Sequence, residues 1–173
     1  MKKLLKFAAL ISLGLGLIGF ILMMVTPSVA YFEDANSWYS GTAAIFGKGS
    51  AHVTISGYSI TGDWEGTLAW TALLAWIFIL VAMLIVLCSF VLSLMKKKLG
   101  EKLAAILDLV VIGLFLVAAM LMFFTAPAFA GANDLNASKL GLGAGWIIGG
   151  ILVLAAGVFA ALPVVSAFIE KRK

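Results

Sequence analysis

Four long apolar runs dominate this sequence and leave few folds open to it. They cover residues 7–30, 68–95, 103–126 and 140–169. Each run exceeds the ~20 residues that a helix needs to cross a ~30 Å hydrocarbon core. In lipid the backbone N–H and C=O groups must be paired inside each segment, so we expect every run to be a helix. The sequence therefore predicts an all-α membrane protein, a four-transmembrane-helix bundle forming one integral membrane domain over residues 1–173.

The basic residues predict how this bundle is oriented. Ten of the twelve Lys and Arg residues lie before the first run, in the loop 96–102, or after the fourth run. The opposite loops, 31–67 and 127–139, hold only Lys48 and Lys139. Cytoplasmic loops carry an excess of Lys and Arg, so we expect a multi-pass protein of the cell membrane with both termini cytoplasmic. With the net charge of +4 distributed in this way, the expected partner is membrane lipid and not nucleic acid.

Residues 1–30 also resemble a secretory signal. A basic start and an apolar stretch are followed by Ser28-Val29-Ala30, a small-x-small cleavage pattern. Cleavage there would leave three spans and an outer N-terminus. The apolar stretch from Phe7 to Val25 is longer than the 7–15 residues usual for a signal, so we expect an uncleaved first helix.

The two halves of the chain resemble each other. Residues 6–13 align without gaps on residues 102–109, and the Thr-Pro segment near residue 27 resembles the Thr-Ala-Pro segment near residue 127. Two helical hairpins in the same orientation, as in transporters with parallel repeats, would explain this. Chance recurrence in a low-complexity apolar protein explains it equally well. In either case we expect Pro27 and Pro127 to end or bend their helices near the outer side.

The first outer loop, 31–67, has the sequence pattern of a small β-sheet. Residues 42–46 and 51–56 are expected to be strands joined by a turn at Gly47-Lys48-Gly49, because the second segment alternates apolar and polar residues. A β-bulge at Gly57 would keep Tyr58 and Ile60 on the apolar side. We therefore expect an extracellular hairpin or small sheet that rests on the outer end of the bundle, since a hairpin alone is marginally stable.

This order of elements resembles the claudin and peripheral-myelin tetraspan family. The resemblance lies in four helices, both termini inside, a long β-rich first outer loop and a short second one, and it covers nearly the whole chain as topology. The family's first loop carries a Trp, then Gly-Leu-Trp, then a disulfide-bonded cysteine pair. This loop has Trp38 and Asp63-Trp64-Glu65 but no Gly-Leu-Trp and no cysteine. The resemblance implies the architecture and no functional residue.

Asp108 is the carboxylate that lies furthest inside an apolar run. Ionisable residues within a membrane are functional candidates by default. Asp108 is five residues past Leu103, so it lies about 7–8 Å along the helix from the cytoplasmic end. The favoured interpretation is structural, a carboxylate near headgroup depth that meets Lys6, Lys102 or water. The alternative is a role in proton-coupled or cation-coupled transport.

Glycines in the first and fourth runs predict close helix packing. Gly14, Gly16 and Gly19 match the dinucleotide-binding fingerprint, but no strand precedes them, so the motif lacks its context. Gly145 and Gly149 form a GxxxG motif, which lets helix backbones approach. We expect these faces to pack within one chain more readily than between copies.

The remaining candidates are loop residues, and none suggests catalysis. His52 with Asp63 and Glu65 is a weak metal signal, and surface exposure of His52 is expected instead. With one His and one Cys, Cys88, the chain lacks the parts of the familiar zinc and Cys-His schemes, so we expect no enzyme, metal or cofactor. Four tryptophans are expected in an interfacial belt, and a fifth, Trp76, against a neighbouring helix. The belt residues are Trp38, Trp64, Trp70 and Trp146.

Two classes of function fit these features. The first is a non-catalytic interaction protein, an auxiliary subunit or an assembly or adhesion factor, that displays its first outer loop to another membrane protein or to a second copy. Its candidate contact residues are Trp38, Lys48, His52, Asp63, Trp64 and Glu65. The second is a small transporter or channel that acts as an oligomer and uses Asp108. The second and fourth runs hold few polar residues for a permeation path, which favours the first class.

Overall fold

The computed structural model describes residues 2–32, 36–95 and 100–171, and the side chains of 7–32, 36–95, 100 and 102–166. Four of its helices are long and apolar enough to cross a membrane, as the sequence predicts. They are α1 (Lys2–Val25), α3 (Trp70–Leu94), α4 (Glu101–Phe123) and α6 (Ala144–Lys171).

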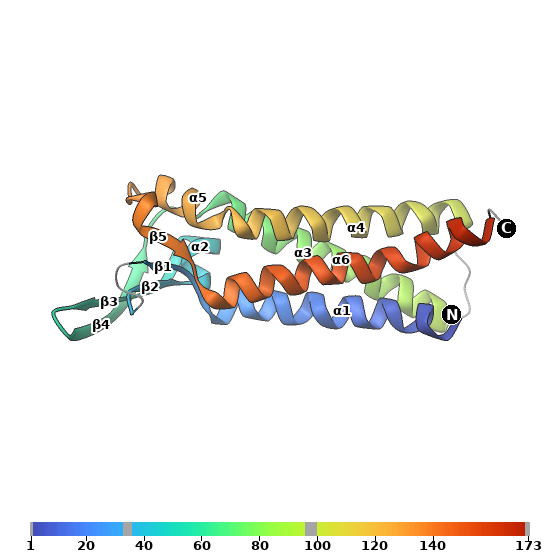
Figure 1. Ribbon diagram of the computed structural model, residues 1–173, viewed down its shortest axis with the longest axis horizontal. Coiled ribbons are helices and arrows are strands. Elements are labelled where there is room, and N and C mark those ends of the chain that lie inside the picture. The colour runs from blue at the N-terminus through green and yellow to red at the C-terminus, as the bar shows by residue number, and fades with distance from the viewer. Residues whose placement is uncertain (1, 33–35, 96–99, 172–173) are drawn as a thin grey trace.

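The long helices form one bundle (Figure 1). Helix α6 packs between α1 and α4, while α3 contacts α4 and, less extensively, α1. The interior contains many small side chains, such as Ala75 and Ala82, together with Phe115, which is fully buried. Large apolar side chains also cover the outside of the bundle, including Leu84 and Leu109. The described helices are therefore apolar both inside the bundle and on its surface.

Helices α1 and α6 pack closely where two of the predicted glycines meet. A Cβ built on Gly19 would lie 2.6 Å from Val153 Cγ2 and 3.1 Å from the Gly149 carbonyl oxygen. Gly16 faces the Phe115 ring, whereas Gly14 has open space beside it. Gly16, Gly19 and Gly149 thus lie at contacts between helices of one chain, and Gly14 does not.

A five-stranded antiparallel sheet covers one end of the bundle (Figure 1). Its strands run in the order β4-β3-β2-β1-β5. Their bounds are β1 (Pro27–Tyr31), β2 (Trp38–Ser40), β3 (Lys48–Ile55), β4 (Tyr58–Glu65) and β5 (Leu140–Leu142). We call the opposite end, where α1 begins and α6 ends, the terminal end.

The predicted strand at 42–46 is wrong, because this segment is the short helix α2 (Gly41–Phe46). The Ser40 hydroxyl caps its start by accepting a hydrogen bond from the Ala43 N–H at 3.2 Å. Gly47 closes the helix in the left-handed region, with φ 72°. The two caps decide between helix and strand in a segment whose apolar residues are too few to show a period.

The predicted bulge at Gly57 is also wrong. Ser56 and Gly57 form a two-residue turn between β3 and β4, with φ 51° and 85°. Two positive φ values in succession are those of a type I′ turn, whose twist suits a hairpin. The turn, and not a bulge, brings Tyr58 and Ile60 to the same side of the hairpin as Val53 and Ile55.

Two of the predicted spans include strands. The first run ends as β1, and the fourth begins as β5, which pairs with β1 between Tyr31–Leu140 and Val29–Leu142. The sheet is thus built from the first expected outer loop together with the adjoining ends of the first and fourth expected spans, and not from that loop alone. Strand β1 contains the predicted cleavage pattern, and Val29 within it is fully buried.

The expected short loop 127–139 is mostly helical. Helix α5 (Thr125–Ala132) follows α4 directly, and the short 3-10 helix η1 (Ala137–Lys139) precedes β5. The Asn133 side chain holds this segment to the one before α3, since it accepts from the Thr67 N–H and donates to the Thr67 carbonyl, each at 2.8 Å. Pro127 lies in α5 whereas Pro27 lies in β1, so the similar segments adopt different structures.

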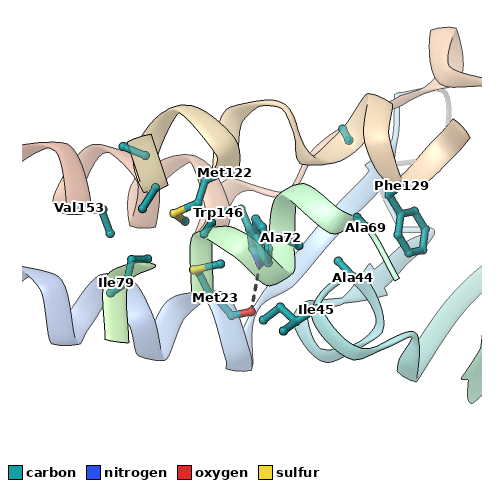
Figure 2. Close-up of a cluster of buried hydrophobic side chains, with 14 of the residues drawn as sticks. Met23, Ala44, Ile45, Ala69, Ala72, Ile79, Met122, Phe129, Trp146 and Val153 are labelled. Carbon is teal, nitrogen blue, oxygen red and sulfur yellow. Dashed lines mark hydrogen bonds between the residues drawn. The ribbon is translucent and has the colours of Figure 1, made fainter. Parts of the chain in front are cut away.

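The core continues from the bundle into the sheet end (Figure 2). Trp146 at the start of α6 is fully buried, and its indole N–H donates to the Met23 carbonyl at 3.2 Å. Placing Trp146 in an interfacial belt is therefore wrong. Trp76 does pack against neighbours, stacking on Phe20 with ring centroids 5.7 Å apart and contacting Phe46 edge-on.

Candidate functional site

The β3–β4 hairpin carries two chemically different faces. Successive cross-strand pairs point to opposite faces of the hairpin, so the pairs Val53–Ile60 and Ile55–Tyr58 lie on the same face. We call these residues the apolar hairpin face. All of them are exposed, at 39% for Val53, 66% for Ile55, 80% for Tyr58 and 69% for Ile60. The described residues leave most of this face uncovered. The hairpin that carries it extends beyond the end of the bundle (Figure 1).

The base of the same side is packed into the protein. Trp64 contacts Tyr39 edge-on at 4.7 Å between ring centroids and also meets Phe129 of α5. Burial, together with the neighbouring Tyr31 hydroxyl at 3.4 Å, raises the pKa of Tyr39 well above its ordinary value. The hairpin is thus anchored at its base by aromatic rings.

The other face of the hairpin is polar and holds most of the predicted contact residues. Lys48 and Glu65 form an ion pair at 3.2 Å, with both side chains exposed. The His52 ring stacks on Trp38 at 5.4 Å and its Nδ1 lies 2.7 Å from the Thr61 hydroxyl. The ion pair is exposed and of modest strength, whereas Trp38 and His52 are half-buried where they stack.

The acidic residues of β4 do not complete a metal site with His52. Asp63 opposes Ser50, and Glu65 is already paired with Lys48. Within the described ranges no three His, Cys, Asp or Glu side chains are placed to hold a metal ion. The candidates on this face are therefore brought together as pairs and not as a cluster of ligands.

Strand β4 lies at one edge of the sheet. Its partner on one side is β3, and no strand of the described chain pairs with its other side. An edge strand leaves a row of backbone N–H and C=O groups free to pair with another chain. The hairpin therefore offers an apolar face and a hydrogen-bonding edge together.

A second candidate site is a cavity of about 660 Å³ toward the terminal end of the bundle. All four long helices line it. Helices α1 and α4 contribute residues from their N-terminal halves, and α3 and α6 contribute residues from their C-terminal halves. Its polar lining comes from Ser12, Ser89, Ser93 and Asp108. Its apolar walls include Val86, Phe90, Val111 and Ala160.

Asp108 faces this cavity half-buried, without a hydrogen bond or ion pair to any other described residue. Lys102 is exposed and forms no ion pair with it, and the side chain of Lys6 lies outside the described residues. Ser12 is fully buried and donates to the Ala156 carbonyl at 2.8 Å. The helical Pro163, which has no N–H, borders the same space.

Sequence reasoning missed that these polar residues share one cavity. Ser89 and Ser93 are four residues apart on α3, so they lie on one helix face, which was a readable signal. Nothing in the sequence indicated that Ser12 and Asp108, which lie on different helices, would join them. The exposure of the apolar hairpin face was likewise hidden, because an alternating pattern predicts a covered face.

No protein-family model matches this chain, and no curated protein matches it.

Proposed function

We propose that the chain is a multi-pass membrane protein that acts as a non-catalytic interaction protein through its β3–β4 hairpin. The four long helices and the apolar surface of their bundle support the membrane placement. The basic residues of the sequence support cytoplasmic termini, which puts the sheet outside the cell. The proposal keeps the claudin-like tetraspan arrangement expected from the sequence, and the four long helices and the small sheet at one end of the bundle support it.

The observation that carries this proposal is the exposed apolar hairpin face beside a free strand edge. Strands of this length are about 26 Å long, so the outer half of the hairpin extends well beyond its anchored base. A long edge strand with exposed apolar residues promotes aggregation unless something covers it. Tyr58 and Ile60 are the most exposed of the set and would be the anchors of a partner.

The proposed occupant is an extracytoplasmic segment of another protein. Such a segment would pair with the edge of β4 and place alternate side chains on the apolar face, which is recognition by strand addition. Lipid is a poorer occupant because it lacks the regular row of alternating donors and acceptors that pairs with a strand edge. The opposite face, with its Lys48–Glu65 ion pair, suits contact with water.

The test is photo-crosslinking in the membrane of the native host. A photo-reactive phenylalanine analogue at Tyr58 should capture one reproducible protein, identified by mass spectrometry. The same analogue at Thr61, on the polar face of the same hairpin, is the matched control and should capture much less. Ile60→Asp should reduce capture about tenfold or more, because it places a charge in the apolar contact, whereas Thr61→Asp should not.

Three results would contradict the proposal. Equal capture from positions 58 and 61 would show that the apolar face is not the contact. Capture of lipid alone would place the hairpin on the membrane surface. Capture of the chain's own copies alone would replace the foreign partner with self-association.

A small transporter is the second candidate, and the cavity beside Asp108 is the observation that favours it. Its test is solute or ion flux in liposomes. Asp108→Asn should abolish flux in a coupled transporter, whereas it should leave the partner captured through Tyr58 unchanged.

A further inference from the structure

The cavity at the terminal end of the bundle combines an apolar lining with one carboxylate. Val86, Phe90 and Val111 form apolar walls, and Asp108 is half-buried among them without a cationic partner in the described chain. A charge in apolar surroundings is costly unless it is paired. A cation that enters this space would supply the missing partner.

We propose that this cavity binds a protonated amine carried on an apolar body. The ammonium group pairs with the Asp108 carboxylate and donates its other hydrogens to the hydroxyl oxygens of Ser89 and Ser93. The apolar body lies against the walls. The volume of about 660 Å³ is within the range of small-molecule sites. Binding in this cavity is independent of the proposed role of the hairpin.

The composition of the lining excludes other ligand classes. An anion would be repelled by Asp108. A divalent metal ion requires several carboxylate or carbonyl ligands, and Asp108 is the single carboxylate among the described residues that line the cavity. An uncharged apolar molecule would leave Asp108 unpaired. Two sources supply an ammonium group on an apolar body: a free small amine and the headgroup of an amine-bearing phospholipid.

The probe is radiolabelled phenethylamine, measured by saturation binding to the whole protein in nanodiscs. Discs of phosphatidylcholine, whose headgroup has no N–H, leave the cavity open to the probe. We expect saturable binding of one phenethylamine per chain. Asp108→Asn should weaken it at least about tenfold, since it removes the partner of a desolvated charge. Asp63→Asn, a carboxylate exposed on the hairpin, is the matched control and should leave it unchanged.

A second variant tests the cavity without altering its charge. Ala160→Phe fills the space from α6 and should also abolish binding, so the proposal can be tested even if Asp108→Asn fails to fold. Folding of each variant is checked by circular dichroism and gel filtration.

Discs containing phosphatidylethanolamine distinguish the two sources. Loss of phenethylamine binding there identifies the lipid headgroup as the occupant, and unchanged binding identifies a free amine. Both results support an ammonium site. Absence of saturable binding to the wild-type protein in phosphatidylcholine discs, or equal binding by a folded Asp108→Asn or Ala160→Phe variant, overturns the proposal.

Discussion

Gly19 controls how closely α1 and α6 approach each other. A methyl group there would meet Val153 and, at 3.1 Å, the backbone oxygen of Gly149. A backbone atom cannot move aside as a flexible side chain can. Gly19→Ala should therefore destabilise the bundle by about 1–3 kcal/mol through overpacking. Gly14→Ala is the matched control on the same helix, because nothing lies within 4 Å of its built Cβ. Thermal unfolding in detergent measures both, and an equal effect of the two substitutions would refute close packing at Gly19.

Tyr39 links the stability of the sheet end to alkaline pH. Burial first, and then Tyr31, raise its pKa in the folded protein, while in the unfolded chain it ionises near pH ~10. Above that pH the unfolded chain releases a proton that the folded protein retains, so the free energy of unfolding should fall as pH rises. Tyr39→Phe should flatten this loss. Chemical unfolding between pH 9 and 11 tests it, and parallel curves for the two proteins would contradict it.

At the scale of elements, the hairpin depends on its turn. Gly57 has φ 85°, a conformation that costs an L-residue roughly 1–2 kcal/mol. Gly57→Ala should therefore loosen β3 and β4 while the helices stay intact. Hydrogen exchange should show faster exchange of the hairpin amides and no change in α4. Gly62→Ala, in the same hairpin with open space around its built Cβ, should leave exchange unchanged.

An element could be predicted where its sequence carried a clear signal, such as the length of an apolar run, a period or a cap. The long helices followed from run length alone. Strands β1 and β5 were missed because a short apolar strand that continues an apolar run has no period of its own. The segment 42–46 has the same ambiguity, and its decisive signals were Ser40 as N-cap and Gly47 as C-cap. The turn at Ser56-Gly57 was readable from its glycine, although Gly47-Lys48-Gly49 appeared to be the better turn.

The candidate site could be predicted only in part, since its parts come from distant segments. The polar face of the hairpin follows from local alternation, which is visible in sequence. The cavity requires four helices in one arrangement, and residue spacing on one helix says nothing about which face a neighbour presents. Asp108 was singled out by its type, but Ser12 joins it only through the packing of α1 against α6.

For the molecule as a whole, the proposed orientation predicts which ends can be labelled from outside. With Cys88→Ala as background, Ser59→Cys on the hairpin should react with a membrane-impermeant maleimide in intact cells. A cysteine appended to the C-terminus should react only after the membrane is permeabilised. The reverse pattern would show that the topology is inverted, and labelling of both in intact cells would contradict the three spans proposed between Ser59 and the C-terminus.

Because β5 lies late in the chain, the sheet cannot be completed until most of the protein has been synthesised. Strand β1 leaves the ribosome directly after the first helix, yet one of its two partners, β5, follows more than a hundred residues later. Until the last hydrophobic segment is inserted, the buried edge of β1 remains open, and contacts between segments so far apart form slowly. In the proposed orientation, a nascent chain stalled before residue 140 would therefore present an unfinished sheet to chaperones and proteases outside the membrane. The sheet is complete only when β5 has paired with β1.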